Sequence, residues 1–290
     1  MNHLRNQPNN QENACAGPYQ ELFIYYLKGL LKPDSKTLPD NCIGNWEEEE
    51  DSFLFFSQPA CEQIENLLSR QPQLSHIDSY HMPYEQWLGE VFTTFEHGKF
   101  RVIPPWEASP ERNSTNDEKL SILLDPGLVF GTGTHPTTRD CLDALELAAG
   151  SKEFTTVLDL GTGTGLLALA AAKLGCTGVI AVDLNFLAAK TAHRNVRRNH
   201  LKNRVVTVQG RAEDMIAFPA DLVIANIHYH VMRQLVNARG FLTPKSFILS
   251  GLLRSEAKDI VEILARHQVK IIKQWTHEGI WHTIYGETNR

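Results

Sequence analysis

The sequence lacks the features that define several large classes of protein. It has no run of 18 apolar residues and no apolar core of a signal peptide near its N-terminus, so neither a transmembrane helix nor a secretory signal is expected. No Cys-x-x-Cys pair occurs, which argues against a disulfide framework and a zinc site. We therefore expect a cytoplasmic protein without a metal. Its reduced thiols are Cys15, Cys42, Cys61, Cys141 and Cys176.

The sequence also lacks an excess of basic residues. Its 290 residues include 28 Lys and Arg against 34 Asp and Glu, a net charge of −6. A dedicated nucleic-acid site normally has a strongly basic face, so none is expected, and a basic protein is a better candidate partner. The basic residues between 190 and 204 are interpreted as a solvated helix face, with contact to ribosomal RNA or an acidic partner as the alternative.

Composition changes along the chain divide it into four segments. Residues 1–17 are polar and predict a disordered tail. Residues 18–83 contain aromatic strand patterns and one helical pattern, which predict a small α+β domain. Residues 84–120 predict a linker with a helix, a strand that stops at Pro104 and a flexible loop. Residues 121–290 form the largest segment.

The C-terminal half alternates apolar strands with helical patterns, which is typical of a doubly wound parallel sheet. Two further strand patterns, joined by a Gly-containing turn at 276–279, predict a hairpin that ends the sheet with an antiparallel strand. The predicted parallel strands are 157–160, 179–182, 205–208, 221–225 and 246–250.

The first of these strands runs into three alternate glycines, Gly161, Gly163 and Gly165. Glycine permits a tight strand-to-helix turn and lets the backbone approach a ligand closely. Asp183 ends the next strand, where its carboxylate can accept hydrogen bonds from ribose hydroxyls. This arrangement predicts a site for a nucleotide-like ligand.

The spacing of the glycines narrows the identity of that ligand. A dinucleotide site requires Gly-x-Gly-x-x-Gly/Ala, but Leu166 occupies the third position, and no lysine follows as in a phosphate-binding loop. The Gly-x-Gly-x-Gly pattern, preceded by Asp159, resembles that of class I S-adenosylmethionine-dependent methyltransferases. Their fold also includes the terminal antiparallel strand. An NAD(P) site and a purely structural turn remain the alternatives.

A second motif precedes the glycine turn. Residues 124–138 read Leu-Asp-Pro-Gly-Leu-Val-Phe-Gly-Thr-Gly-Thr-His-Pro-Thr-Thr and lead directly into a predicted helix. Hydroxyl groups and free amides at a helix N-terminus suit a carboxylate or another anionic group. A capped loop with ordinary turn chemistry explains the same residues.

Together with this motif, Ile103-Pro-Pro-Trp106, Asn226-Ile227 and Leu249-Ser-Gly-Leu252 resemble the ribosomal protein L11 methyltransferase family over residues 84–290. The resemblance implies a class I fold with a mostly parallel seven-stranded sheet. It also implies an enzyme that transfers methyl groups from S-adenosylmethionine to lysine side-chain and N-terminal amines of ribosomal protein L11. A small N-terminal domain would recognise the acceptor, and we expect a monomer.

The resemblance also implies functional residues. Asn226 is the candidate catalytic residue, whose carboxamide would orient the acceptor amine, with a simple strand cap as the alternative. His228 and His230 are interpreted as helix-start or pocket-lining residues, not a metal pair. Trp281 and His282 are expected at an edge or in the core. The candidate cofactor-binding residues are Thr138, Gly161, Gly163, Gly165, Asp183, Asn226, Phe130 and His135.

Three departures from the family pattern affect these expectations. The glycine turn has threonines where the family commonly has Cys and Ser, His228-Tyr-His230 replaces smaller residues, and the N-terminal domain looks shortened before Trp46. The last departure leaves open a different protein acceptor for the same chemistry. A non-catalytic S-adenosylmethionine-binding protein is a further alternative.

Overall fold

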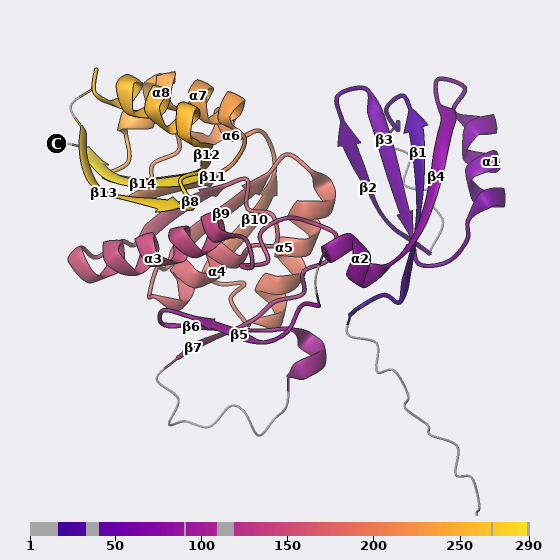
Figure 1. Cartoon of the computed structure of the whole chain (residues 1–290), viewed down its shortest axis with the longest axis horizontal. Helices are drawn as coiled ribbons and strands as arrows, with labels where there is room; N and C mark the ends of the chain where they lie inside the picture. Colours follow the sequence, from indigo (N-terminus) through magenta and orange to yellow (C-terminus); the bar gives the residue numbers. More distant parts are fainter. Residues whose placement is uncertain (1–16, 33–40, 90, 109–118, 268, 289–290) are drawn as a thin grey trace, which may run out of the picture.

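The structure is a computed structural model that describes residues 17–32, 41–89, 91–108, 119–267 and 269–288. It contains three β-sheets, of four, seven and three strands (Figure 1). The predicted tail lies almost wholly outside the described residues, as does most of the predicted loop at 107–119. Within the described ranges, no helix has both the length and the apolar composition needed to cross a membrane.

The N-terminal sheet is antiparallel and has the strand order β2-β3-β1-β4. Alternate residues of β1 point to opposite faces of this sheet. Tyr25 and Leu27 pack with helix α1 on one face, whereas Leu22 and Ile24 belong to a different buried cluster on the other. The elements are β1 (Glu21–Lys28), β2 (Cys42–Glu48), β3 (Asp51–Phe56), α1 (Cys61–Arg70) and β4 (Ser75–Pro83).

The seven-stranded sheet confirms the predicted doubly wound architecture. Its order is β10-β9-β8-β11-β12-β14-β13, and the first five strands are parallel to one another. Strand β14 runs antiparallel to β12 and β13, as the hairpin pattern predicts. The strands are β8 (Thr156–Leu160), β9 (Gly178–Asp183), β10 (Val205–Gln209), β11 (Leu222–Asn226), β12 (Ser246–Leu253), β13 (Val269–His277) and β14 (Trp281–Thr288).

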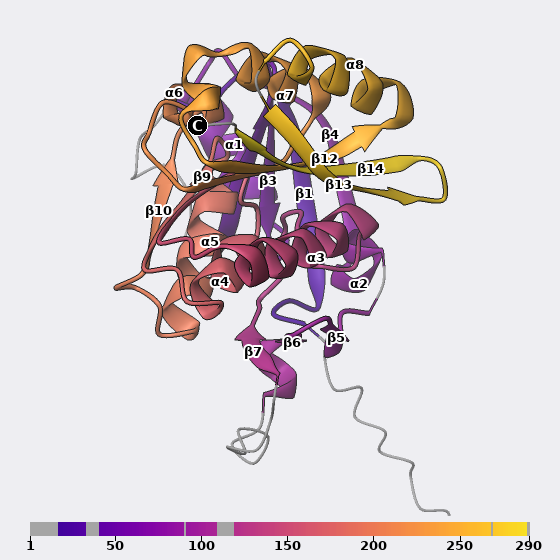
Figure 2. The ribbon, with the colours of Figure 1, turned by 90° about the vertical axis from the view of Figure 1, so that its left-hand side faces the viewer.

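Helices cover both faces of this sheet, and Figures 1 and 2 show the two layers. Helices α3, α4 and α5 pack on one face, and α7 and α8 pack on the other with the short α6. Buried strand residues therefore contact helices on both sides, which explains the nearly continuous apolar runs. The helices are α3 (Pro136–Ser151), α4 (Leu166–Lys173), α5 (Phe186–Arg198), α6 (Ala212–Met215), α7 (Tyr229–Asn237) and α8 (Arg254–Leu264).

A third sheet lies between the two larger ones in the sequence. Strand β6 ends before Pro104, as predicted, and pairs in parallel with β7 and antiparallel with β5. The predicted linker helix is α2, which leads out of β4. These elements are α2 (Tyr84–Leu88), β5 (Phe95–His97), β6 (Phe100–Ile103) and β7 (Leu120–Leu123).

The N-terminal sheet packs directly on the C-terminal half. Leu22, Ile24 and Phe55 share one buried cluster with Leu128 and Leu187. The hydroxyl of Tyr84 donates a buried hydrogen bond of 2.6 Å to the carbonyl oxygen of Gly127. Residues 127 and 128 belong to the threonine-rich loop 124–138, so this loop also forms part of the contact between the two sheets.

Candidate cofactor and acceptor site

The glycine turn connects β8 to α4 at the carboxyl edge of the parallel strands. The N–H groups of Gly161 and Thr162 donate to the carbonyl oxygen of Val182, at 2.8 and 2.9 Å. The N–H of Gly163 donates to a carboxylate oxygen of Asp183 at 2.9 Å. The end of β9 therefore holds the turn in place.

The N–H groups of this turn are occupied within the protein. Those of Thr164 and Gly165 donate to the carbonyl oxygens of Phe130 and Thr162. The N–H of Leu166 makes a long hydrogen bond of 3.4 Å to the Thr164 hydroxyl. A pyrophosphate needs free N–H donors at this position. The turn therefore does not favour a dinucleotide.

Asp183 lies beside the turn, where the sequence predicts it. Its carboxylate accepts hydrogen bonds from the N–H groups of Gly163 and Asn185, each at 2.9 Å. Burial raises the pKa of this carboxyl, although both hydrogen bonds oppose the shift. Each carboxylate oxygen has two lone pairs, so Asp183 retains acceptor capacity for ligand hydroxyls.

Asp159 lies buried beneath the turn. One carboxylate oxygen accepts hydrogen bonds from the Thr162 hydroxyl at 2.6 Å and from the N–H of Ala168 at 3.1 Å. The other oxygen is buried without a hydrogen-bond partner among the described residues. Burial raises the pKa of this carboxyl to about 7, against the opposing effect of the two hydrogen bonds.

Asp159→Asn is expected to increase the stability of the ligand-free protein at pH 8 by about 2 kcal/mol, because it removes a buried charge that lacks a full set of partners. The folded-state pKa lies above the unfolded value, so ionised Asp159 destabilises the fold. The gain should therefore grow between about pH 4 and pH 7 and stay constant above.

Urea unfolding at pH 5 and pH 8 measures this difference. The exposed Asp214→Asn is the matched control, with an expected change below about 0.5 kcal/mol at both values. An Asp159→Asn protein that is equally stabilised at both pH values would contradict a titrating Asp159.

The threonine-rich loop 124–138 lies against the glycine turn. Besides the bond from Thr164 N–H to the Phe130 carbonyl at 3.0 Å, the Thr164 hydroxyl donates to the carbonyl of Gly131 at 2.5 Å. A Cβ atom on Gly163 would overlap the Phe130 carbonyl oxygen. The two motifs, separate in sequence, therefore form one continuous site.

Asn195, a residue that the sequence patterns do not single out, joins these motifs from helix α5. Its carboxamide nitrogen donates to the carbonyl oxygens of Asp125 and Thr164, at 2.8 and 2.9 Å. Its oxygen accepts the N–H of Asp125 at 3.0 Å. No local sequence pattern identifies this residue, because its partners lie on distant segments of the chain.

Asn195→Ala is expected to lower the free energy of unfolding by about 3 kcal/mol, because three buried backbone groups lose their partner. The midpoint of urea denaturation measures the loss. Asn237→Ala removes an exposed asparagine whose side chain bonds only within its own helix, and should change stability by less than about 0.5 kcal/mol. A similarly small effect at Asn195 would show that this link does not hold the loop.

Three aromatic rings lie together beside the loop. His135 is the N-cap residue of α3, and its Nδ1 accepts the N–H of Thr137 at 3.3 Å. The His135 ring lies 5.4 Å from that of Phe130 and 4.9 Å from that of Trp281, edge to face in both cases. Burial lowers the pKa of His135, which favours the neutral ring that this cap requires.

The structure adds a contact of Trp281 that the sequence interpretation did not include. An edge or core position was expected for Trp281 and His282 in the terminal hairpin. The structure brings Trp281 against His135 of the loop, because β14 lies beside β12 near the site. His282 pairs with the Thr276 hydroxyl within the hairpin, at 3.2 Å. No local pattern in the sequence indicates the approach of Trp281 to the loop.

Asn226 ends β11, the neighbour of β8, at the point where the order of the parallel strands reverses. Its carboxamide nitrogen donates to the Thr138 hydroxyl at 3.4 Å. Within the described part of the chain, no donor is bonded to its carboxamide oxygen. A Cβ on Gly251 would lie 3.0 Å from that oxygen, so a glycine in β12 keeps the space beside it open.

The remaining candidates lie apart from this site or serve local structure. His228 is the N-cap residue of α7, and no group of three metal-ligating side chains occurs among the described residues. On the basic face of α5, Arg198 pairs with the buried carboxylate of Asp125 at 3.2 Å, while Lys190 and Arg197 are exposed. Part of that face therefore stabilises the loop.

Comparison with known proteins supports a common origin. Residues 50–289 match the family model described as ribosomal protein L11 methyltransferase. A relative of that name in Staphylococcus carnosus is 34% identical over 240 residues, which cover 78% of this chain and 75% of the relative. A second relative of that name, in Halalkalibacterium halodurans, is 37% identical over 172 residues, which cover 59% of this chain and 53% of the relative.

A solved structure of a protein with the same described function is also similar to this chain. The ribosomal protein L11 methylase of Lactobacillus delbrueckii subsp. bulgaricus superposes with a TM-score of 0.59 at 26% identity, and the match covers 69% of this chain and all of that one. The similarity therefore extends over the whole of that solved chain.

Proposed function

Because this chain belongs to the ribosomal protein L11 methyltransferase family, we propose that it transfers methyl groups from S-adenosylmethionine to lysine side-chain and N-terminal amines of ribosomal protein L11. Membership in the family makes the chain a methyltransferase. The cofactor contacts are inferred from the site, whereas the acceptor and its amines are inferred from the family. The joining of the glycine turn to loop 124–138 through Thr164 and Phe130 is the observation that carries the proposal.

The residues present fit S-adenosylmethionine. This cofactor carries ribose hydroxyls, which require acceptors, and the carboxylate of Asp183 retains lone pairs for them. The occupied N–H groups of the turn fit a pyrophosphate poorly. The residues proposed to hold the cofactor are Thr138, Gly161, Gly163, Gly165, Asp183, Asn226, Phe130 and His135.

The remaining chemistry concerns the acceptor amine. S-adenosylmethionine would supply a methyl group bound to its sulfonium sulfur. The neutral amine would attack the methyl carbon in line, the carbon–sulfur bond would break, S-adenosylhomocysteine would leave, and the methylated ammonium would release its proton to solvent. The oxygen of Asn226 accepts a hydrogen bond from the amine and directs its lone pair, so proximity and alignment supply much of the acceleration. The rings of Phe130, His135 and Trp281 replace water around the amine, which lowers its pKa and favours the neutral form.

Purified L11 incubated with the enzyme and radiolabelled S-adenosylmethionine tests the acceptor. Mass spectrometry should locate methyl groups on lysine side chains and on the N-terminal amine of L11. Label on another protein of a whole-cell extract, with none on L11, would support the alternative acceptor. Calorimetry with S-adenosylhomocysteine and with NADH separates the proposal from an NAD(P)-dependent enzyme. Cofactor binding without label on any protein would indicate a non-catalytic binding protein.

A further inference from the structure

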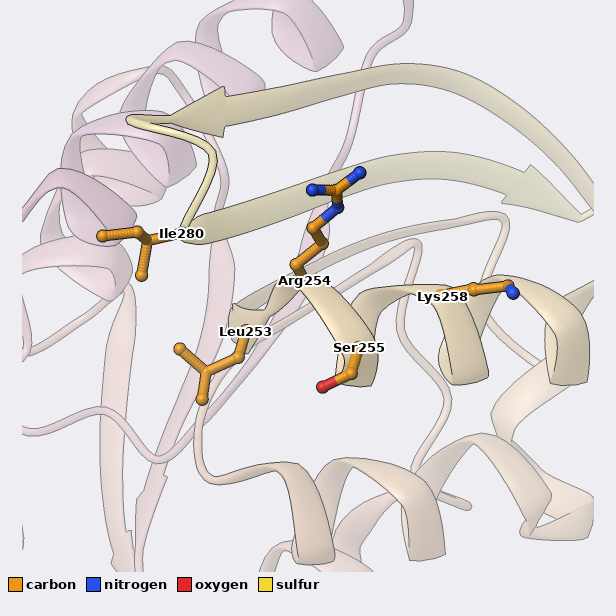
Figure 3. A pocket seen from close by; sticks show the side chains of 5 residues that line it. All are labelled: Leu253, Arg254, Ser255, Lys258 and Ile280. Carbon is orange, nitrogen blue, oxygen red and sulfur yellow. The ribbon is translucent and has the colours of Figure 1, made fainter.

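A groove of about 600 Å³ lies between helix α8 and the β13–β14 hairpin. Figure 3 shows Ile280 on the hairpin turn, Leu253 at the start of α8, and the Arg254 side chain rising from the helix toward the hairpin. The apolar end of the groove is open to solvent, since Leu253 is 41% exposed and Ile280 49%. Ser255 and Lys258 line the rest.

The apolar end of this groove adjoins the candidate site. Leu253 pairs with Trp281 in the β12–β14 register, and the Trp281 ring contacts His135 of loop 124–138. Two residues before Leu253, Gly251 lies against the carboxamide oxygen of Asn226. A chain segment whose amine reaches Asn226 can therefore continue past Trp281 into the groove.

Two cationic side chains, Arg254 and Lys258, also line the groove. Arg254 has no carboxylate within ion-pair distance among the residues that the structure describes. Lys258 contacts Glu262 only at 3.9 Å, with both side chains largely exposed. An exposed pair of this kind contributes little, so Lys258 remains available to another anion. The nearby Glu256 side chain accepts the N–H of Leu253 as a helix cap.

From these observations we infer that the groove binds the segment of the acceptor protein next to the methylated amine, and that this segment carries an apolar residue followed by a carboxylate. The inference rests on the proposed protein acceptor. The apolar side chain packs on Leu253 and Ile280, and the carboxylate lies between Arg254 and Lys258.

The dimensions of the groove restrict the spacing of these two groups. Lys258 lies five positions after Leu253, the N-cap residue of α8, which corresponds to a rise of about 7.5 Å along the helix axis. An extended chain advances about 3.3 Å per residue, so about two residues of the acceptor span this distance. The carboxylate is therefore expected about two positions beyond the apolar residue.

Two fluorescently labelled peptides test this inference. Both peptides contain a lysine and a leucine. They differ at one position, two residues after the leucine, where one peptide has an aspartate and the other a lysine. Fluorescence anisotropy with S-adenosylhomocysteine present measures binding to the full chain. The wild-type protein should bind the aspartate peptide at least about tenfold more tightly, because like charges in the groove repel.

The double substitution R254E/K258E should reverse this preference and raise KM for a methylated protein acceptor, with the affinity for S-adenosylhomocysteine unchanged. R197E reverses an exposed charge on α5 and should leave the preference intact. Similar affinities of the two peptides for the wild-type protein, including no measurable binding, overturn the inference, as does a preference that the double substitution does not alter.

The same measurements separate this inference from the proposed function. If L11 is methylated and the peptide preference is absent, only the groove is assigned wrongly. If L11 is not methylated and the double substitution reverses the peptide preference, the groove serves another acceptor.

Discussion

Asn226→Ala is expected to lower kcat for methyl transfer by about a hundredfold, because in the proposed mechanism the acceptor amine loses the oxygen that aligns its lone pair with the methyl carbon. The substitution also removes one hydrogen bond to Thr138, so a smaller effect on the cofactor is expected. The dissociation constant of S-adenosylhomocysteine should change by no more than about fivefold, which corresponds to the net free energy of one neutral hydrogen bond. Single-turnover kinetics and calorimetry measure the two effects separately.

Two further variants define the role of Asn226. Asn226→Asp keeps an acceptor oxygen in place and should retain more activity than the alanine variant. Asn237→Ala, which removes an exposed asparagine on α7, should be as active as the wild type. If Asn226→Ala binds cofactor normally and methylates at the wild-type rate, Asn226 only caps its strand.

Gly163→Ala is expected to abolish measurable cofactor binding and to lower the free energy of unfolding by about 3 kcal/mol or more. Gly163 has φ +55°, where an L-residue is strained, and the added Cβ would overlap the carbonyl oxygen of Phe130. Because that atom is backbone, relief requires loop 124–138 to move away from the turn. Calorimetry with S-adenosylhomocysteine and urea unfolding measure both losses.

Gly175→Ala is the matched control for this glycine. Gly175 has φ +114°, but an added Cβ meets no atom within 4 Å. The Gly175→Ala protein should therefore be destabilised by backbone strain but should bind S-adenosylhomocysteine as tightly as the wild type. If Gly163→Ala binds S-adenosylhomocysteine as tightly as this control does, the contact between the turn and the loop is not needed for cofactor binding.

Much of the fold follows from local patterns. Four of the five parallel strands lie within a residue of the predicted ranges, and β12 extends three residues further, to Leu253. Strands buried on both faces require continuous apolar runs, which makes them visible in the sequence. The terminal hairpin was predicted from the Gly-containing turn. Asp159 and Asp183 could be placed at the ends of β8 and β9 from their spacing to the glycines alone.

The pairing of distant segments could not be predicted in this way. Asn195 links the loop to the glycine turn because α5 packs across both, and its carboxamide is buried only in the folded chain. The raised pKa of Asp159 likewise arises from burial, which the motif does not encode. The charge at Arg254 is local, but its position beside Ile280 depends on the neighbouring hairpin.

The sequence by itself determined the family, and through it the cofactor that we propose, since glycine spacing and the threonine-rich motif are local properties of the chain. Only the tertiary structure decided which distant segments surround the candidate site. It brought Trp281 to His135, set Leu253 beside Ile280, and packed the N-terminal sheet on Leu128 of the loop. These contacts depend on strand order and on apolar burial between distant segments, which no single stretch of sequence specifies.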